Sequence, residues 1–289
     1  MSVRIVIGAS TDVGRVRDHN EDGYIIDEGL SLVAVADGMG GHRGGEVASA
    51  TALEAFYASF TENGGLHEAV VAANEAVVER ASDDEQLRGM GTTITAGVLG
   101  EDGTMILGHV GDSRAYLLRD GELARVTTDH SLVEELMAAG ELTAEEAERD
   151  PRRSMITRAL GLDAGVDVDL YPIALNEGDR LVICSDGLTN MVNEPDIQSI
   201  LEKQPDAERA AHELVDAANA AGGVDNTTVV VINVVAADAP QPEDAPEPAE
   251  DVVDAATTVQ MEAVTEAEAE PEVEPPPKRR RRFLRRRKS

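Results

Sequence analysis

Two apolar runs in this sequence end in the same acidic dipeptide. The run LVAVAD leads into Asp37–Gly38, and the run LVICSD leads into Asp186–Gly187. Each predicts a buried strand that ends at a carboxylate, and two further acids, Asp112 and Asp225, stand in comparable places beside strand patterns. An unpaired charge taken out of water costs several kcal/mol. Because no Lys or Arg alternates with these acids closely enough to neutralise them, a divalent cation is the expected partner.

The candidate ligands are all oxygen atoms, which limits the choice of metal. The sequence has no cluster of Cys and His residues, so zinc is disfavoured and Mg²⁺ or Mn²⁺ is favoured. The loop RVRDHNED at 15–22 places Asn20, Glu21 and Asp22 close to Arg17. Carboxylates for a metal beside a guanidinium for an anion suit a phosphate ester. The pattern indicates a metal-dependent enzyme.

These acids must be positioned by strands and helices that come in blocks. Hairpin turns such as LGEDGT and RDGE favour antiparallel pairing. Because strands and helices do not alternate one by one, the better prediction is an α+β layered domain rather than a doubly wound parallel sheet. The polar segment 129–159 is expected to be a surface insertion. The expected helices are 45–60, 66–81 and 207–221, and the expected strands are 4–10, 24–27, 31–37, 92–99, 105–110, 115–119, 169–173, 180–185 and 227–235.

An ordered series of motifs adds a family resemblance. The chain carries RDHNED at 17–22, ADGMGGHRGGEVAS at 36–49, GTTITA at 91–96, GDSRAY at 111–116, ITRALG at 156–161, CSDGL at 184–188 and DNTTVV at 225–230. This series resembles the metal-dependent type 2C protein Ser/Thr phosphatases, in particular the bacterial members paired with Ser/Thr kinases in actinobacteria. The likeness covers about residues 3–235. We therefore expect a four-layer α-β-β-α sandwich, in which two antiparallel sheets are flanked by helices.

The resemblance implies a pair of bridged metal ions, Mn²⁺ or Mg²⁺. Asp37 would bridge both ions. Asp186 and Asp225 would complete one site, and Glu21 with the carbonyl oxygen of Gly38 would complete the other. Two such ions lower the pKa of a shared water for direct attack on phosphorus, so that no phosphoenzyme is needed.

Further residues carry implied roles of their own. Asp112 matches the acid that, together with Asp186, holds a third and weaker metal in bacterial relatives, and Arg17 matches the residue that grips the substrate phosphate. Eukaryotic relatives have a His directly after the Asp-Gly, proposed as the general acid for the leaving oxygen. Here that position is Met39, and His42 would need a different geometry, so the leaving-group acid stays open.

Simpler interpretations compete with these roles. An Asp-Gly pair is also typical of turns, and Asp112 could cap the turn before the strand at 115–119. A cysteine-based phosphatase would need an Arg five residues after its Cys, but the residues after Cys184 are SDGLTNM. Cys184 alternates within a strand pattern and is expected to fill the core.

The composition limits which binding partners and which cellular compartment are expected. The net charge of -31 makes nucleic-acid binding by the main domain unfavourable. No signal peptide or membrane span is evident, and a single cysteine fits a reducing cytoplasm. We expect a monomeric cytoplasmic protein whose partners are phosphorylated proteins, including Ser/Thr kinases.

The chain divides into three parts. Residues 1–236 form the predicted catalytic domain, 237–277 an acidic Ala/Pro/Glu linker expected to be disordered, and 278–289 a polybasic tail. The tail could be a fortuitous basic end, an anchor to an anionic membrane surface, or a partner for the acidic body of the same chain. Electrostatic attraction favours the second and third of these interpretations over nucleic acid.

The predicted function is hydrolysis of phosphoserine and phosphothreonine in proteins, opposing bacterial Ser/Thr kinases. The alternative is a catalytically silent pseudophosphatase that binds phosphoproteins, which the intact set of acids argues against. A phosphatase of a sigma-factor regulatory switch is a second competitor, weakened because no sensor domain is fused to the chain.

Overall fold

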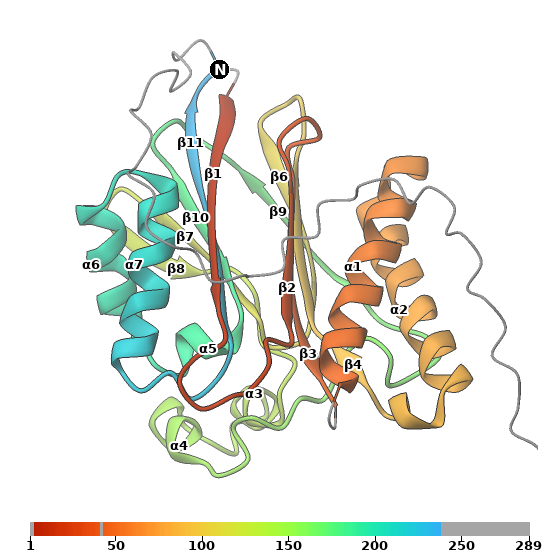
Figure 1. The fold of residues 1–289 in the computed structure, drawn as a ribbon. Helices are drawn as coiled ribbons and strands as arrows, with labels where there is room; N and C mark the ends of the chain where they lie inside the picture. Colours follow the sequence, from red (N-terminus) through yellow and green to blue (C-terminus); the bar gives the residue numbers. More distant parts are fainter. Residues whose placement is uncertain (1–2, 41–42, 238–289) are drawn as a thin grey trace, which may run out of the picture. The chain divides into compact units, whose positions relative to one another are not determined.

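The computed structural model describes residues 3–40 and 43–237, and it contains two antiparallel sheets that pack face to face (Figure 1). This confirms the predicted α+β fold. The first sheet has the strand order β1-β11-β10-β7-β8, and the second has the order β2-β3-β5-β6-β9, with β4 (Gly91–Thr92) paired to β3. The strands of the first sheet are β1 (Val3–Asp12), β11 (Thr227–Ala236), β10 (Arg180–Cys184), β7 (Arg114–Arg119) and β8 (Glu122–Arg125). Those of the second are β2 (Asp22–Asp27), β3 (Leu32–Met39), β5 (Ile94–Leu99), β6 (Thr104–Val110) and β9 (Asp169–Ala174).

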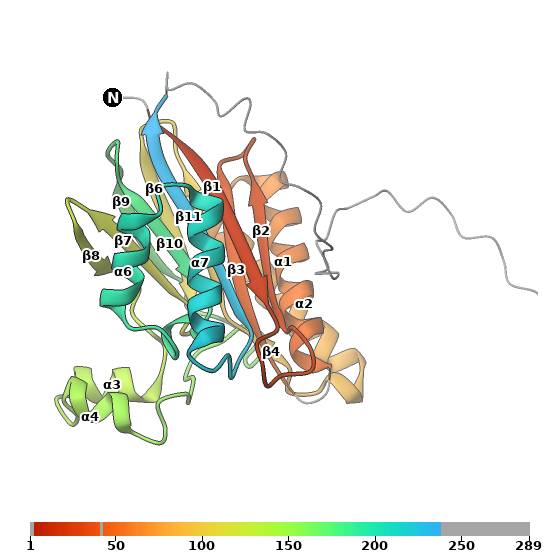
Figure 2. The ribbon, with the colours of Figure 1, turned by 60° about the vertical axis from the view of Figure 1, so that its left-hand side comes forward.

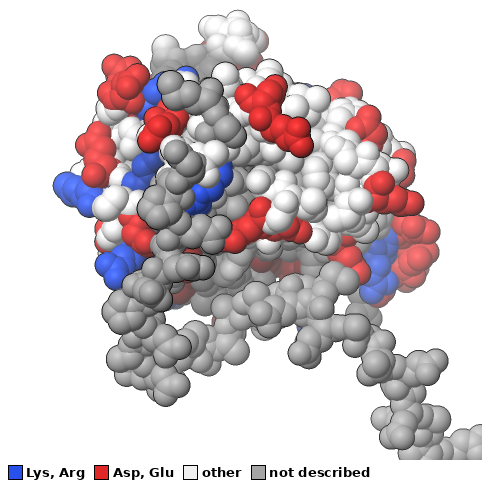
Figure 3. Space-filling model, turned by 90° about the horizontal axis from the view of Figure 1, so that it is seen from above, with Lys and Arg blue, Asp and Glu red and all other residues white. Residues whose placement is uncertain are grey.

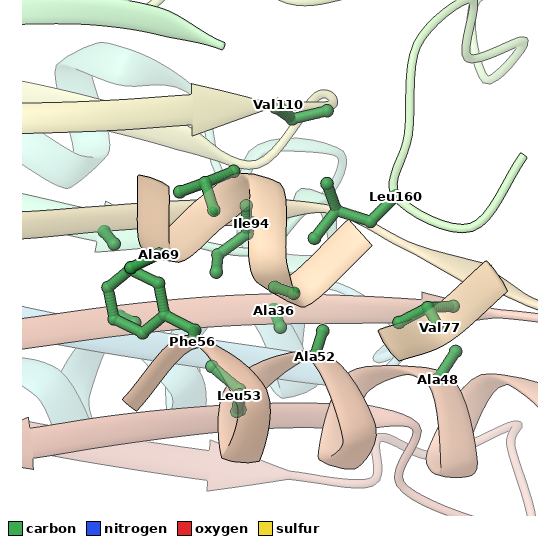
Figure 4. Close-up of a cluster of buried hydrophobic side chains, with 14 of the residues drawn as sticks. Ala36, Ala48, Ala52, Leu53, Phe56, Ala69, Val77, Ile94, Val110 and Leu160 are labelled. Atoms are coloured by element: carbon green, nitrogen blue, oxygen red, sulfur yellow. The ribbon is translucent and has the colours of Figure 1, made fainter. Parts of the chain in front are cut away.

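Helices cover the outer face of each sheet, which gives the four predicted layers (Figure 1). Helices α1 (Gly44–Asn63) and α2 (Leu66–Asp83) pack on the second sheet. Their buried side chains include Ala52, Phe56 and Ala69, which meet Ile94 and Val110 of the sheet (Figure 4). Helices α6 (Glu194–Lys203) and α7 (Ala207–Ala220) cover the first sheet.

The central strands are mostly apolar because both of their faces are buried. Along β10, Leu181 and Ile183 point between the two sheets, whereas Val182 and Cys184 point toward α6 and α7. Successive side chains of a strand point to opposite faces, so one strand supplies two cores. Cys184 is fully buried, as predicted, and burial raises the pKa of its thiol to about 12.

The segment between β8 and β9 is only partly the surface insertion that the sequence predicted. Helices α3 (Leu132–Ala138) and α4 (Ala144–Arg149) do project from the end of the sandwich where α5 (Asp186–Thr189) and β4 also lie (Figure 2). Its first residues, Asp129, His130 and Ser131, are buried instead. The polar pattern of this segment gave no sign that its beginning is packed against β6 and β7.

The described surface is strongly acidic. Asp and Glu side chains are spread over the face shown in Figure 3, among fewer Lys and Arg side chains. Among the described residues, no helix is both long and apolar enough to cross a membrane.

Candidate metal centre

Acidic side chains from both sheets meet at one end of the sandwich. Asp22 and Asp37 are directly paired in the register of β2 and β3. Asp186 follows β10 and begins α5. The hydroxyl of Ser185 donates a hydrogen bond of 2.7 Å to Asp22 Oδ2, and this contact joins the two sheets at the acidic end.

The acids at this end lack enough positive charge to balance them, with Asp112 buried and Asp22, Asp37 and Asp186 half-buried. Burial raises the pKa of Asp22 to about 7, with the nearby charge of Asp186 adding to the effect. Burial also raises the pKa of Asp112 to about 7 and of Asp186 to about 6, and it raises that of Asp37 well above its ordinary value. Each carboxylate is further destabilised by negative neighbours, so the cluster favours protons or cations.

The donor set fits hard divalent cations. It consists of carboxylate and carbonyl oxygens, which Mg²⁺ and Mn²⁺ prefer. Asp22 Oδ1 is buried and has no hydrogen-bond partner, which leaves an acceptor that a cation or its water ligands would satisfy. Among the described residues, no three acidic, His or Cys side chains stand close enough to hold a metal as they are placed here.

Glu21 and the carbonyl of Gly38 face the same small space, as their predicted shared role requires. A Cβ atom added to Gly45 would lie 2.6 Å from Glu21 Oε1 and 2.7 Å from the Gly38 carbonyl oxygen. The absence of a side chain at Gly45 therefore leaves room for these two oxygens. Burial raises the pKa of Glu21, although the nearby Arg17 opposes that rise.

The two Asp-Gly pairs are not turns. Gly38 lies within β3, which continues two residues past Asp37, and Gly187 lies within α5. A Cβ on Gly38 would come within 2.1 Å of the Gly45 carbonyl oxygen, and one on Gly187 within 1.9 Å of the Asn226 carbonyl oxygen. Each glycine permits a close backbone approach that holds its Asp in the cluster.

Asp225 has the one basic partner that the sequence analysis did not foresee. Arg17 Nη2 donates a 2.8 Å hydrogen bond to Asp225 Oδ2, although 208 positions separate the two residues. The expectation that no basic residue neutralises the strand-end acids is therefore wrong for Asp225. The long separation explains the error, because only the folded loop brings Arg17 beside Asp225. Both residues are partly exposed at the rim of the cluster.

Asn226 was missed by sequence reasoning, yet it holds the site together. Its Oδ1 accepts a 2.8 Å hydrogen bond from the backbone N–H of Glu21. Its Nδ2 donates to the carbonyl oxygens of Val13 and His19, both at 2.9 Å. Asn226 thereby fixes the loop that carries Arg17 and Glu21 against Asp225. Its place in the DNTTVV motif was the only signal for it.

Asp112 is buried near the cluster, and a histidine pair packs beside its neighbour Gly111. The backbone N–H of Gly111 donates to His130 Nδ1 at 3.0 Å, and His130 Nε2 lies 3.1 Å from Asp169 Oδ2. The ring of His109 packs beside that of His130, with centroids 4.8 Å apart. These contacts are structural.

The leaving-group acid is not identified by the fold. Met39, the residue that directly follows this Asp-Gly pair, ends β3 opposite Gly91 of β4. The alternative donor His42 lies outside the described residues.

Two packed sheets flanked by helices, with unpaired acids at one end, define the class of this protein. Residues 15–221 match the protein phosphatase 2C family, so the chain belongs to that family. It is 39% identical over 235 residues to the serine/threonine phosphatase stp of Listeria welshimeri, covering 77% of this chain and 93% of that protein. It is 43% identical over 233 residues to the serine/threonine protein phosphatase PstP of Mycobacterium tuberculosis, covering 78% of this chain and 44% of that protein.

Solved structures agree with this assignment. The Mycobacterium tuberculosis PstP/Ppp phosphatase superposes with a TM-score of 0.74 at 40% identity, covering 82% of this chain and 100% of that one. The catalytic domain of PstP in complex with two manganese ions gives a TM-score of 0.73 at 39% identity, covering 81% of this chain and 100% of that one. The predicted family and fold are thus confirmed.

Proposed function

We propose that this protein is a metal-dependent phosphatase that hydrolyses phosphoserine and phosphothreonine in other proteins. The observation that carries the proposal is the meeting of Asp22, Asp37, Asp112 and Asp186 at one end of the sandwich, beside a rim arginine. Relatives that share the whole domain are named serine/threonine phosphatases. Nothing in the described residues favours a silent pseudophosphatase, because the predicted acidic set is complete.

The proposed ligands follow from the oxygens that face the cluster. Asp37, Asp186 and Asp225 would hold one ion, while Asp37, Glu21 and the Gly38 carbonyl would hold the other, with Mn²⁺ or Mg²⁺ as the metal. When bound, the two cations would supply Lewis-acid activation of water and phosphate. We further propose that Asp112, together with Asp186, contributes to a third and weaker site.

Arg17 would bind the substrate phosphate. Its guanidinium carries five N–H donors in a planar fork that matches phosphate oxygens. The bond to Asp225 uses Nη2 of a side chain that is 47% exposed, so a phosphate can approach from solvent. Asp225 holds the guanidinium at the rim of the acidic cluster and so orients it before substrate arrives.

The decisive test measures hydrolysis of p-nitrophenyl phosphate and of a phosphothreonine peptide with Mn²⁺, Mg²⁺ or EDTA. We expect turnover that needs metal and is lost in Asp186→Asn. Asp216→Asn serves as the matched control, because Asp216 is an exposed residue of α7 outside the cluster. A folded protein that binds the phosphopeptide but turns over neither substrate with any metal would favour the pseudophosphatase instead.

We also propose a cytoplasmic protein that opposes Ser/Thr kinases, with residues 1–236 as catalytic domain, 237–277 as linker and 278–289 as a membrane-binding tail. Nine basic residues flank Phe283 and Leu284 in the tail, and each adds up to about 1 kcal/mol of attraction near an anionic leaflet. Flotation with anionic liposomes, at low and high salt, should show salt-sensitive binding that disappears without residues 278–289. Equal flotation of both chains would overturn the anchor.

A further inference from the structure

Two loop segments run side by side next to the proposed phosphate-binding arginine. At one end, the backbone N–H of Arg15 donates to the Gly223 carbonyl oxygen at 2.6 Å. At the other end, Arg17 donates to Asp225 at 2.8 Å. Residue 16 and residue 224 are the middle positions between these two links. The loop segments 15–17 and 223–225 are therefore tied to each other at both ends, and together they are called the platform below.

The middle position of each segment is an exposed valine. The exposed fraction is 65% for Val16 and 47% for Val224, the first being the highest among the large apolar side chains that are exposed in the described structure. Exposed apolar residues that gather beside a binding site mark an interaction surface more often than isolated ones do. Both valines are direct neighbours of the residues that form the Arg17–Asp225 pair.

The platform is held firmly, so its shape is set before any ligand arrives. A Cβ on Gly14 would come within 2.4 Å of the Asp225 carbonyl oxygen, which shows how closely the two segments pack. Asn226 adds its two hydrogen bonds to the carbonyls of Val13 and His19. A rigid surface loses little conformational entropy when it binds a partner.

We propose that Val16 and Val224 form a contact surface for an apolar side chain that flanks the phosphorylated residue of the protein substrate. This inference rests on the proposed function and gives the site a sequence preference. Neighbouring Cα atoms lie about 3.8 Å apart, so a residue one or two positions from the phosphorylated one can reach the valines while Arg17 holds the phosphate.

The test uses pairs of phosphothreonine peptides that differ only by Leu or Ser within two positions of the phosphothreonine. With Mn²⁺, the wild-type protein should show a kcat/KM roughly tenfold higher for the Leu peptide, at the low end of the discrimination that apolar contacts give. In the double variant Val16→Ser/Val224→Ser, this ratio should fall toward one. The variant Val16→Thr/Val224→Thr keeps the side-chain shape and should lower the ratio in the same direction, even if the Ser variant folds poorly.

The control variant Leu30→Ser removes an exposed apolar side chain from the distant turn after β2 and should keep the wild-type ratio. Hydrolysis of p-nitrophenyl phosphate, which has no flanking residues, reports separately on the proposed catalytic centre. Wild-type protein that cleaves p-nitrophenyl phosphate and both peptides equally would overturn this inference but leave the proposed function intact. A dimer that the valine variants break, with peptide preference unchanged, would assign the platform to a second copy and also overturn the inference.

Discussion

The acidic end of the sandwich and the region around β7 both bury aspartates, but they neutralise them differently. Asp129 is 8% exposed and receives hydrogen bonds from Arg114 Nε and Nη2, the shortest at 2.7 Å. Asp179 is 3% exposed and receives bonds of 2.9 and 2.5 Å from Arg119. Asp37 and Asp112, by contrast, have other aspartates as their main charged neighbours.

This difference teaches that burial alone does not reveal the role of an acid. A buried carboxylate that meets an arginine fork is complete within the fold and serves structure. A buried carboxylate surrounded by other carboxylates leaves an excess of negative charge that only protons or external cations can neutralise. The fold tolerates the unpaired group because its partners arrive from solution.

The largest expected effect comes from removing a charge from the unpaired group. Asp37→Asn should lower kcat by about a hundred- to a thousandfold, since a preorganised group at a reacting centre is worth that much. The same change should raise the Tm of the EDTA-treated protein, because it removes repulsion from Asp22 and Asp186. Activity assays and melting curves of one preparation test both expectations. A lower Tm without metal would contradict the proposed excess of negative charge.

The matching change at a paired aspartate should lower the stability of the protein instead of raising it. Asp129→Asn leaves the guanidinium of Arg114 buried without its anion, and breaking such a pair costs about 3 kcal/mol or more. Chemical denaturation should show this loss with and without Mn²⁺. A stability equal to that of the wild type would mean that the pair is screened by solvent.

The unpaired and the paired aspartates should also differ in how their contribution to stability depends on pH. The pKa values of Asp22 and Asp112 are raised to about 7 in the folded state, so the protonated forms favour folding. Without metal, stability should therefore be highest below about pH 4 for these groups and should fall as the pH rises toward 7. We expect a decrease in Tm of roughly 5 °C over that interval in EDTA, and its abolition by Mn²⁺. A metal-free Tm that rises from pH 5 to pH 7 would contradict the pKa shifts.

The smallest effect concerns the pair that belongs to neither group. Arg17→Lys keeps a positive charge beside Asp225 but loses the planar fork. We expect kcat/KM to fall by about tenfold, mainly through KM, with an unchanged Tm because the pair is partly exposed. Steady-state kinetics on a phosphopeptide tests this, and a stability loss as large as that of Asp129→Asn would make the pair structural.

Apolar runs such as VVVI in β11 were sufficient to predict buried strands and an α+β domain, whereas the two-sheet arrangement followed from the family resemblance. The sequence was not sufficient for β8 and α6. Strand β8 has four residues and none is fully buried, and α6 buries only Ile197 and Leu201. Each apolar pattern is therefore too short to predict its element, because β8 has only four residues and the helical spacing of Ile197, Ile200 and Leu201 covers little more than one turn of α6.

The same limit applies within the candidate site. The apolar runs that precede Asp37 and Asp186 predict the positions of these two acids. The central place of Asp22, the bond between Arg17 and Asp225, and the bracing by Asn226 all depend on contacts between distant parts of the chain. Strand register and loop docking decide these contacts, and neither is written in local spacing.

The position of β11 has a consequence for when the protein becomes active. This strand lies between β1 and β10, and it pairs with β1 along ten residues from Val3–Ala236 to Asp12–Thr227. Asp225 and Asn226 stand directly before it, so the first sheet and the acidic end are both incomplete until this strand is in place. During synthesis, a nascent chain must expose residue 236 beyond the ribosome before it can remove a phosphate. Activity therefore cannot begin until nearly the whole described domain has been synthesised.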